Sequence, residues 1–378
     1  MTPTPSTRFV AASTFRSRAA LGLLTTLIAA SACMAQGLVP REQAWAWGDN
    51  ANGQCYIGYA NSPRRVVQVS AGMYHTLALQ ADGTIIGTQI YNQYGTQNYG
   101  QSASPNGRFK WITAGGFTSA AVAEDGSIFG WGNAGQLWSR PAEGYIEADG
   151  SDSESYPSFI ARRADGSISS NLCRAYQPMS RKDEYGAYKY ISAGWEDTFA
   201  IRADGTLWSH SGAWNSRADL SGLAQVSQGY RHIVILRASD GTIKCEGDNQ
   251  YGACNAPPGR FVQIQAGGLF SAALDEAGTV VTWGYMVNFS CCNVKQYLPR
   301  YLWGARWSMI SAGAGHMAGI LTPCYSDIDL NRTTDASDLS LALLDFGTCA
   351  DCDADLDEDG EVTTADISLL LLSWGDCS

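Results

Sequence analysis

The sequence predicts an all-β, seven-bladed propeller followed by a small α-helical calcium-loop domain. Three observations predict this fold class: a motif that recurs about every 40 residues, half a repeat at each end of the repeating region, and two acidic loops near the C-terminus. A chain of 378 residues is long enough for two such domains. We expect a signal peptide at residues 1–35, the propeller at residues 44–322 and the calcium-loop domain at residues 323–378.

The repeat is marked by a glycine that follows a hydrophobic residue and two small or polar residues. Seven glycines hold this anchor position: Gly72, Gly115, Gly150, Gly194, Gly229, Gly267 and Gly313. The six intervals from the first to the last span 241 residues, about 40 each, which is the size of one four-stranded propeller blade. Asp-Gly follows most anchors in register, as at Asp82-Gly83, and between two strand-like runs it indicates a hairpin, because both residues tolerate positive φ.

The two ends of the repeating region complement each other. The region begins with a lone Trp47-Gly48 phrase, and the last anchor, Gly313, is followed by a strand-like run without an Asp-Gly turn. We therefore expect both ends to share one blade, which closes the ring and removes exposed sheet edges. The tryptophans of the Trp-Gly phrases, which include Trp131 and Trp283, are predicted to lie in the core.

Two phrases carry a resemblance to a known family. They are Ser70-Ala71-Gly72-Met73-Tyr74-His75-Thr76-Leu77-Ala78-Leu79 and Trp47-Gly48-Asp49-Asn50-Ala51-Asn52-Gly53-Gln54. Both are similar to the signature phrases of the regulator-of-chromosome-condensation repeat family, and the resemblance covers about residues 44–322. It implies the propeller fold. It implies little about function, because members range from nucleotide exchange factors to secreted inhibitors, among them a seven-bladed bacterial β-lactamase inhibitor.

The acidic tail contains two loops with the ligand spacing of an EF-hand. Oxygen-bearing side chains recur at positions 1, 3, 5, 9 and 12, with a backbone carbonyl at position 7, and calcium takes six to eight such oxygen ligands. The predicted ligands are Asp327, Asp329, Asn331, Asp335 and Asp338 in the first loop, and Asp355, Asp357, Asp359, Glu361, Thr363 and Asp366 in the second. The alternative is a solvated acidic tail without bound calcium.

An apolar run follows each loop, at Leu339–Leu344 and Ile367–Leu372, and is typical of a short packed helix. Two loops with one helix each resemble a type I dockerin, over about residues 324–376, and this resemblance implies calcium binding and docking onto a cohesin module. The second loop fits better, with Gly360 at the sharp turn where the first has Arg332. The positions that usually contact cohesin carry other residues here, including Leu343-Leu344 and Leu371-Leu372, so a cohesin-like partner is only weakly implied.

The N-terminus has the layout of a secretory signal. Three arginines precede an apolar run from Ala19 to Ala32, which ends in small residues, and cleavage is expected after Ala35. Nothing in the chain reaches the length of a membrane span. We expect an extracellular protein; the alternative is a lipid anchor at Cys33, because Ala30-Ser31-Ala32-Cys33 is a weak lipobox.

The ten cysteines that remain after Cys33 are an even number, which in an exported protein indicates disulfides. Cys245 and Cys254 flank a turn and are expected to pair across a hairpin. Cys324 with Cys377 and Cys349 with Cys352 are possible pairs in the tail, although connectivity cannot be read from sequence.

The charge of the chain is concentrated in its tail. From Cys324 to Ser378 there are fourteen acidic residues and one basic residue, whereas residues 1–323 hold 24 basic and 22 acidic residues. The propeller is therefore nearly neutral and lacks the basic surface that nucleic acid requires.

No catalytic motif is present, and we expect a non-enzyme without a nucleophile triad, HExxH or P-loop. His75, His232 and His316 each stand three residues after an anchor glycine, so they are predicted to be structural and to bond backbone groups within a blade.

A binding face is predicted from the residues just after the anchor glycines. Equivalent positions of successive blades lie on one rim, and aromatic residues with an occasional arginine are favoured at binding surfaces. The predicted face consists of Tyr74, Phe117, Trp195, Tyr230, Arg231 and Phe270. The alternative is ordinary packing of the rim loops.

The sequence thus predicts a secreted, non-catalytic binding protein whose propeller recognises an extracellular protein or glycan. The acidic module would attach it to a partner in a calcium-dependent manner. Two alternatives remain open: an inhibitor of a secreted enzyme, and an accessory or enzymatic component of extracellular polysaccharide degradation.

Overall fold

The computed structural model describes residues 44–57, 65–88, 98–133, 138–150, 158–172, 180–195, 197–286, 305–321, 326, 328, 333–348, 354–356 and 361–376. The predicted signal peptide, the lipobox cysteine Cys33 and the four cysteines of the tail lie outside these residues, so those predictions stay predictions. Among the described residues, no helix has both the length and the apolar character that a membrane crossing would need.

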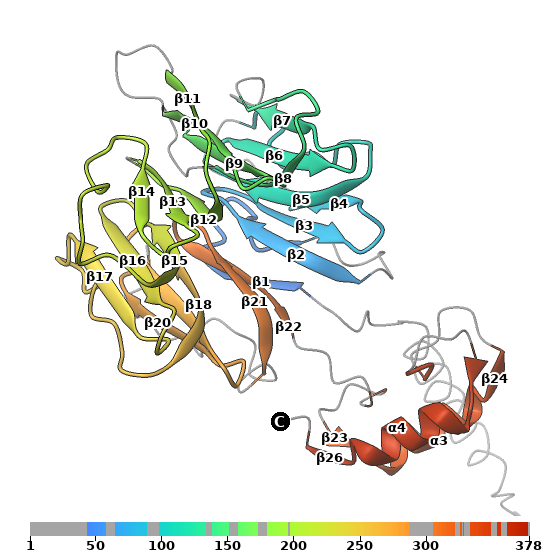
Figure 1. Ribbon diagram of the computed structural model, residues 1–378. Helices are drawn as coiled ribbons and strands as arrows, with labels where there is room; N and C mark the ends of the chain where they lie inside the picture. Colours follow the sequence, from blue (N-terminus) through green and yellow to red (C-terminus); the bar gives the residue numbers. More distant parts are fainter. Residues whose placement is uncertain are drawn as a thin grey trace, which may run out of the picture. The chain divides into compact units, whose positions relative to one another are not determined.

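Apart from four short strands in the tail, the described strands form seven antiparallel sheets of three or four strands each, in a propeller-like arrangement (Figure 1). Blades 1 to 3 are β2 (Val66–Ala71), β3 (Thr76–Gln80) and β4 (Ile85–Gly87); β5 (Phe109–Ala114), β6 (Thr118–Ala123) and β7 (Ile128–Gly132); and β8 (Tyr145–Gly150), β9 (Phe159–Arg163), β10 (Ile168–Leu172) and β11 (Ser180–Glu184). Blades 4 to 6 are β12 (Tyr188–Ala193), β13 (Thr198–Arg202) and β14 (Leu207–Ser209); β15 (Leu223–Gln228), β16 (His232–Arg237) and β17 (Ile243–Gly247); and β18 (Phe261–Ala266), β19 (Phe270–Asp275) and β20 (Val280–Gly284).

Blade 7 closes the ring as the sequence predicts. It consists of β21 (Trp307–Ala312), β22 (His316–Leu321) and β1 (Ala44–Gly48), and β1 pairs with β22 from Ala44↔Ile320 to Gly48↔His316. Blade 7 contacts blade 1, and each of the other blades contacts the next along the chain. Both ends of the repeating region therefore contribute to one sheet, which covers the edges that an open ring would expose.

The hairpins and the core also follow the pattern in the sequence. The glycines of the Asp-Gly turns, and Gly278 of the related turn Ala277-Gly278, have φ between 65° and 85°, a region that glycine enters without steric cost. The hydrophobic core lies between neighbouring blades; for example, Leu77 and Ile85 of blade 1 pack with Phe109 and Ile112 of blade 2. Trp47 and Trp283 are buried as predicted, while Trp131 is half-buried.

One anchor glycine was assigned one residue too early. Gly150 pairs with Phe159 as Ala71 pairs with Thr76, so Gly150 stands at the position of Ala71 rather than of Gly72. The residue equivalent to Gly72 in blade 3 is Ser151, which lies outside the described residues. The blade count is unaffected, because β8 still opens its own sheet.

Polar side chains at two positions of the first strand join neighbouring blades. At the fifth position a side-chain oxygen accepts the amide of the next blade, as Ser70 Oγ does from Ala114 N at 2.9 Å and Ser227 Oγ from Ala266 N at 2.9 Å. At the third position, Gln68 donates to Ile112 O and accepts from Ile112 N, both at 2.9 Å. The glutamine amide thus imitates a peptide group of a neighbouring strand.

The described part of the tail contains two short helices and two short sheets. The helices are α3 (Ala336–Leu344) and α4 (Thr364–Leu372), and the strands are β23 (Thr333–Thr334), β24 (Gly347–Thr348), β25 (Glu361–Val362) and β26 (Gly375–Asp376). The strand before α3 pairs with the strand after α4, and the strand after α3 pairs with the strand before α4. Each half of the tail is therefore joined to the other half by two short antiparallel strand pairs.

Candidate functional site

The rim loops of six blades share one turn. In each, the anchor glycine donates its N–H to the carbonyl of the residue three positions later, at 2.8 to 3.0 Å. The pairs are Gly72 with His75, Gly115 with Thr118, Gly194 with Asp197, Gly229 with His232, Gly267 with Phe270 and Gly313 with His316. Because the third residue begins the second strand or directly precedes it, the first and second residues after the glycine are the ones presented on the rim.

Five of the six predicted face residues occupy these two positions. Tyr74, Phe117, Trp195 and Tyr230 are half-buried, and Arg231 is exposed. The aromatic rings pair between neighbouring blades: Tyr74 stacks on Phe117 with centroids 4.9 Å apart, and Trp195 meets Tyr230 at 4.6 Å. The rim therefore carries aromatic surface in two places, one on blades 1 and 2 and one on blades 4 and 5.

The placement of Phe270 on this face was wrong. Phe270 is the third residue after its anchor glycine, so its side chain points into the sheet interior, where it is fully buried in a cluster with Trp47 and Trp307. The rim residue of blade 6 is Leu269, the second after Gly267. Counting from the glycine, instead of selecting the aromatic residue, would have identified it.

Sequence reasoning also missed a second set of rim residues. The loop after the third strand returns to the same face, because three antiparallel strands end where the first one ends. It presents Tyr99 on blade 1 and Tyr251 on blade 5, which are 39% and 47% exposed. The signal was available in the matching phrases Asn98-Tyr99-Gly100 and Gln250-Tyr251-Gly252.

The rim residues of blades 1 and 2 form a filled corner. Phe117 stacks on Tyr74 and also meets the edge of Tyr99, with centroids 5.4 Å apart. Three rings from one chain thus occupy the junction of the two blades, and such pairs contribute about 1 kcal/mol each beyond the area that they bury.

The corner between blades 5 and 6 is packed differently: the ring of Tyr285 lies against that of Tyr251, with centroids 5.5 Å apart. A shallow pocket lies here, lined by Arg231, His232, Asp248, Gln250, Tyr251, Ala253 and Leu269. His232 forms part of its uncharged floor, because burial lowers the pKa of this imidazole to about 4. Arg231, Asp248 and Gln250 are exposed at the mouth.

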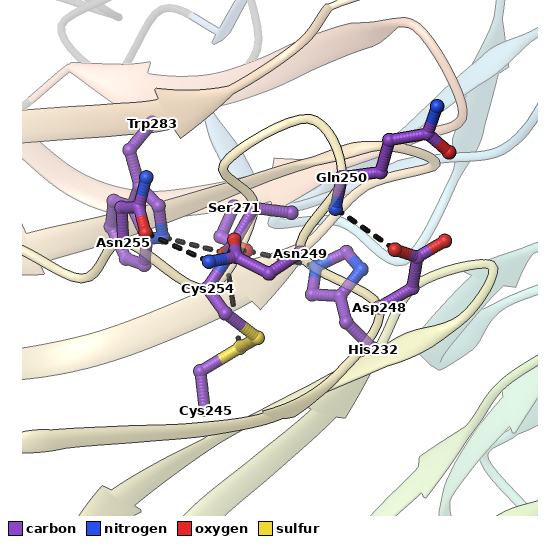
Figure 2. The surroundings of a disulfide bond; sticks show 10 residues. His232, Cys245, Asp248, Asn249, Gln250, Cys254, Asn255, Ser271 and Trp283 are labelled. Carbon is purple, nitrogen blue, oxygen red and sulfur yellow. Dashed lines mark hydrogen bonds between the residues drawn. A yellow bond between two sulfur atoms is a disulfide. The ribbon is translucent and has the colours of Figure 1, made fainter.

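The loop that carries Asp248, Gln250 and Tyr251 is held rigidly, as Figure 2 shows. The predicted disulfide Cys245–Cys254 closes its base. Asn249 Oδ1 accepts the Cys254 amide at 2.8 Å, and Asp248 Oδ1 accepts the Gln250 amide at 2.9 Å. Two donors of blade 6, Ser271 Oγ and Trp283 Nε1, bind the carbonyl of Ala253 at 2.8 and 2.7 Å. The side chains at the mouth are therefore presented from a preorganised backbone.

The three repeat histidines are structural, but they bond between blades and not to the backbone of their own blade. Nε2 of His75 lies 2.7 Å from Ser119 Oγ, that of His232 lies 2.9 Å from Ser271 Oγ, and that of His316 lies 2.9 Å from Thr76 Oγ1. Burial lowers the pKa of His75 and His316 to about 3, so both imidazoles are uncharged at neutral pH and link neighbouring blades.

Each half of the tail is organised by the aspartate at position 12 of its predicted loop. Asp338 is fully buried and accepts the amides of Ile328 at 2.6 Å and Asp335 at 2.8 Å. Asp366 is fully buried in the same way and accepts the amides of Leu356 at 2.6 Å and Thr363 at 2.7 Å. The two carboxylates therefore draw residues 2 and 9 of each loop together, and this closure fits a loop that wraps around a cation.

The remaining predicted ligands divide into two groups. Asp335 and Thr363 cap the N-termini of α3 and α4, while Asp355 precedes Leu356 and Glu361 begins β25. Asp327, Asp329, Asn331, Asp357 and Asp359 lie outside the described residues. Among the residues that the structure does describe, no group of three or more histidine, cysteine or acidic side chains is arranged to hold a metal ion.

Comparison with known proteins relates the chain to one group of repeat proteins. It is 25% identical over 283 residues to the ultraviolet-B receptor UVR8 of Arabidopsis thaliana, covering 65% of this chain and 61% of that protein. It is 28% identical over 134 residues to the mitochondrial RCC1 domain-containing protein RUG3 of the same plant, covering 29% of this chain and 30% of that protein. The chain thus spans less than two thirds of either relative. No known protein-family profile matches it.

Solved structures show the same fold at low sequence identity. Prp20p of Saccharomyces cerevisiae, described by its binding to Gsp1p and histones, has a TM-score of 0.57 at 14% identity over 81% of this chain and 94% of that one. Human WBSCR16 has a TM-score of 0.56 at 13% identity over 75% of this chain and 99% of that one. The repeat, the seven sheets and these similarities together support an RCC1-type repeat β-propeller.

Proposed function

We propose that the protein is an exported, non-catalytic binding protein that recognises another protein through the rim face of its propeller. The observation that carries the proposal is the rim itself: turns fixed by backbone hydrogen bonds present Trp195, Tyr230, Arg231 and Tyr251 on one face. Aromatic and arginine side chains on a rigid backbone lose little conformational freedom on binding, and they dominate the energy of many protein interfaces. Prp20p, a propeller of the same fold, is described by its binding to Gsp1p and histones.

The test compares a rim variant with a variant on another part of the surface. We expect the double variant Trp195→Ala, Tyr230→Ala to weaken capture of the protein's exported partner at least tenfold, measured by surface plasmon resonance on the immobilised full chain. Tyr185→Ala is the matched control, because Tyr185 is 86% exposed but follows β11, away from the rim loops. An equal loss of affinity in both variants, or no loss in either, would contradict binding through the rim.

A second part of the proposal is that the tail binds calcium and acts as an attachment module. It is supported by the two buried aspartates, which impose the same closure on both loops, and by the oxygen-rich composition of the predicted ligand set. Calcium would supply positive charge to a segment with a net charge of −13, from fourteen acids and one arginine, and would thereby favour its folded state.

Calorimetric titration of the full chain with calcium tests this part. We expect Asp366→Asn to remove one binding event and Asp338→Asn the other, because each removes a charged ligand at position 12. Asp345→Asn is the control: this residue is the C-cap of α3, outside both loops. Identical titrations of Asp366→Asn and the control would refute calcium binding by the second loop.

An inhibitory role toward a secreted enzyme is the second candidate. The disulfide-closed loop at Asp248–Ala253 favours it, because a preorganised loop reduces the entropy lost when a binder docks into a cleft. An inhibitor would lower the activity of its enzyme in proportion to the fraction bound. Tyr251→Ala would then weaken both the binding of the enzyme and its inhibition by the same factor.

A further inference from the structure

Four blades carry an exposed arginine directly before their first strand. These arginines are Arg65, Arg108, Arg260 and Arg306, of blades 1, 2, 6 and 7, which are consecutive around the closed ring. The corresponding residues of blades 3, 4 and 5 are Gly144, Ala187 and Gly222. The first strand starts beside the turn of the preceding blade, as Phe109 N donates to Gly83 O at 2.9 Å. The four arginines therefore lie on the face of the Asp-Gly turns, opposite the rim loops.

Two of these arginines lack the aspartate that the repeat supplies elsewhere. Arg108 Nη1 lies 3.0 Å from Oδ2 of Asp82, the aspartate of the turn in the preceding blade. In the turn that precedes Arg306, the residue at the position of that aspartate is Ala277. In blade 7, which precedes the arginine of blade 1, it is Pro323. The sequence thus omits the turn carboxylate at two successive places on this face.

The two acids of the turn before Arg306 have other partners. Asp275 Oδ1 accepts two amides of its own turn, at 2.9 and 2.8 Å. Glu276 Oε1 lies 3.8 Å from Nε of Arg260 in an exposed ion pair. Arg306 itself is exposed and forms no ion pair with another described residue. Its charge is therefore available to a carboxylate from elsewhere.

The chain leaves the propeller between two of the arginines. Strand β22 ends at Leu321, which pairs with Trp307, the residue after Arg306. On the other side, Val66, the residue after Arg65, packs in one hydrophobic cluster with strand β22. The end of β22 is thus flanked by an arginine of its own blade and an arginine of blade 1. We call Arg306 and Arg65 the exit arginines.

The segment that follows β22 is the acidic tail. From Cys324 to Ser378 it contains fourteen acids and one arginine, a net charge of −13. Its first acid, Asp327, stands six residues after Leu321, and six residues of extended chain span at most about 20 Å. Covalent attachment through so short a segment gives the tail a high effective concentration at the exit arginines.

We propose that the acidic tail, when it carries no calcium, binds intramolecularly to the exit arginines. The statement rests on the calcium binding proposed for the tail and adds what calcium must displace. A carboxylate that coordinates calcium is neutralised by the metal and attracts a guanidinium group less. Calcium and the exit arginines therefore compete for the same tail, and calcium releases it for attachment. Because this coupling is reciprocal, the exit arginines lower the calcium affinity of the tail.

Calorimetric titration of the full chain with calcium tests the competition. The double variant Arg65→Gln, Arg306→Gln removes both exit charges, and we expect it to bind calcium at least about threefold more tightly than wild type at low salt. This gain should disappear at a salt concentration of about 1 M, because the Debye length there is only about 3 Å.

The double variant Arg108→Gln, Arg260→Gln is the matched control. Both arginines hold the same repeat position and are exposed, but each already pairs with an acid of a turn, Asp82 or Glu276. We expect this variant to bind calcium with the affinity of wild type. Equal gains in the two double variants would overturn the proposal, because they would reflect the total charge of the chain and not the exit arginines.

Carbodiimide crosslinking detects the contact itself. Arg306→Lys keeps the positive charge and supplies an amine that carbodiimide joins to a carboxylate in contact with it. In the calcium-free chain, we expect peptide mapping of the monomeric fraction to find position 306 joined to an acid of residues 324–378, and calcium to suppress this product. Arg108→Lys is the control, and it should be joined to Asp82 with or without calcium.

The outcomes separate this inference from the calcium proposal. If calcium binds wild type and the exit variant equally tightly, or if position 306 is joined to no acid of the tail, the inference is refuted and calcium binding stands. If no chain binds calcium, the calcium proposal fails by itself, and the crosslink alone decides whether the tail binds the exit arginines. A crosslink found only in dimers would replace the intramolecular contact with one to the tail of a second copy.

Discussion

Two junctions between blades differ in the side chain that accepts the backbone amide of the next blade. They are the junction of blades 1 and 2 and the junction of blades 3 and 4. At the first, Ser70 Oγ accepts the amide of Ala114 at 2.9 Å. At the second, the equivalent residue is Asp149, whose Oδ2 accepts the amide of Ala193 at 2.8 Å and whose Oδ1 accepts Thr113 Oγ1 at 3.1 Å. Asp149 remains partly accessible to solvent but lies deep among protein atoms, and this desolvation raises its pKa to about 6.

The difference separates what the repeat requires from what it tolerates. The amide of the next blade requires an oxygen acceptor, because a buried N–H without a partner costs about 1–3 kcal/mol. Serine, threonine and aspartate all meet this requirement, at Ser70, Thr113 and Asp149. Only aspartate adds a charge that titrates, so the ring is geometrically regular but electrostatically uneven.

The largest effect is expected at the anchor glycines, which six of the seven blades share. A Cβ on Gly229 would overlap the carbonyl oxygen of Gly267 and the ring of His232. We therefore expect Gly229→Ala to lower the free energy of unfolding by about 3 kcal/mol or more, because backbone and a buried ring must both move. Urea unfolding monitored by tryptophan fluorescence measures this.

Gly186→Ala is the control for that change. Gly186 is exposed, and the nearest atom to an added Cβ is a ring carbon of Tyr188 at 3.3 Å. Its substitution should shift stability by no more than about 0.5 kcal/mol. Comparable losses in the two variants would mean that the close approach of neighbouring blades is not what the anchor position protects.

The next largest effect concerns the glutamines of the third position. Gln68 is buried and makes two hydrogen bonds to the backbone of Ile112, so Gln68→Leu leaves a buried N–H and a buried carbonyl without partners. The expected loss is about 2–3 kcal/mol. Gln225 accepts from Ile264 N as Gln68 does from Ile112 N, but it donates to Val262 O, and it is half-buried, so water can replace these contacts. Gln225→Leu should therefore cost less than half as much in the same urea titration.

A further contrast lies in pH dependence. The folded-state pKa of His75, His316 and His232 lies below the unfolded value, so the unfolded chain binds more protons and stability falls as the pH drops below about 6.5. Asp149 acts in the opposite direction: its folded pKa of about 6 exceeds the unfolded value, so it adds stability as the pH falls from about 6 to about 4. Three histidines outweigh one aspartate, and the melting temperature should decrease on acidification.

Two single substitutions separate these contributions. His316→Thr places at blade 7 the residue that Thr118 supplies at the same position of blade 2, and it should flatten the fall in melting temperature between pH 7 and pH 5. Asp149→Ser places at blade 3 the residue that Ser70 supplies in blade 1, and it should steepen that fall. Parallel melting curves for wild type and both variants would show that neither group titrates as the structure requires.

The regular features of the fold were predictable, because they recur at fixed spacing. The anchor glycines, the Asp-Gly hairpins and the strand shared by the two ends each follow from local steric rules that the sequence repeats. The site was harder to predict. Tyr251 lies beside Arg231 and Leu269 in a shallow pocket and against the ring of Tyr285, and no single repeat contains that information.

The errors have the same origin. Phe270 was placed on the rim because it is aromatic, although its distance from Gly267 assigns it to the strand interior. The histidines were expected to bond within a blade, yet their partners are hydroxyl groups of the next blade around the ring, 44, 39 and 240 residues away in the sequence. Local pattern identifies the position in the repeat, and only packing between blades identifies what that position contacts.

The smallest expected effect compares the loop at Gly247–Cys254 with its copy at Gly48–Cys55. In both, an asparagine Oδ1 accepts the amide of the cysteine, at 2.8 Å from Asn249 and at 2.9 Å from Asn50. Cys55 thus holds the position of Cys254, while Ala46 holds that of Cys245, two residues before the glycine that ends each strand. Cys55 has no disulfide partner among the described residues.

Ala46→Cys should therefore form a second disulfide and raise the free energy of unfolding by up to about 2 kcal/mol, since the bridge closes only a short loop. The reaction should be slow without added oxidised glutathione, because burial and the nearby Asp49 raise the pKa of the Cys55 thiol to about 12 and leave little thiolate. A peptide map under non-reducing conditions detects the bridge, and melting with and without reductant measures its effect. If the bridge forms but the melting temperature does not change, the loop at Gly48–Cys55 is already as rigid as the loop closed by a disulfide. The Cys245–Cys254 bond would then keep its own loop ordered on the exposed rim without adding to the stability of the fold.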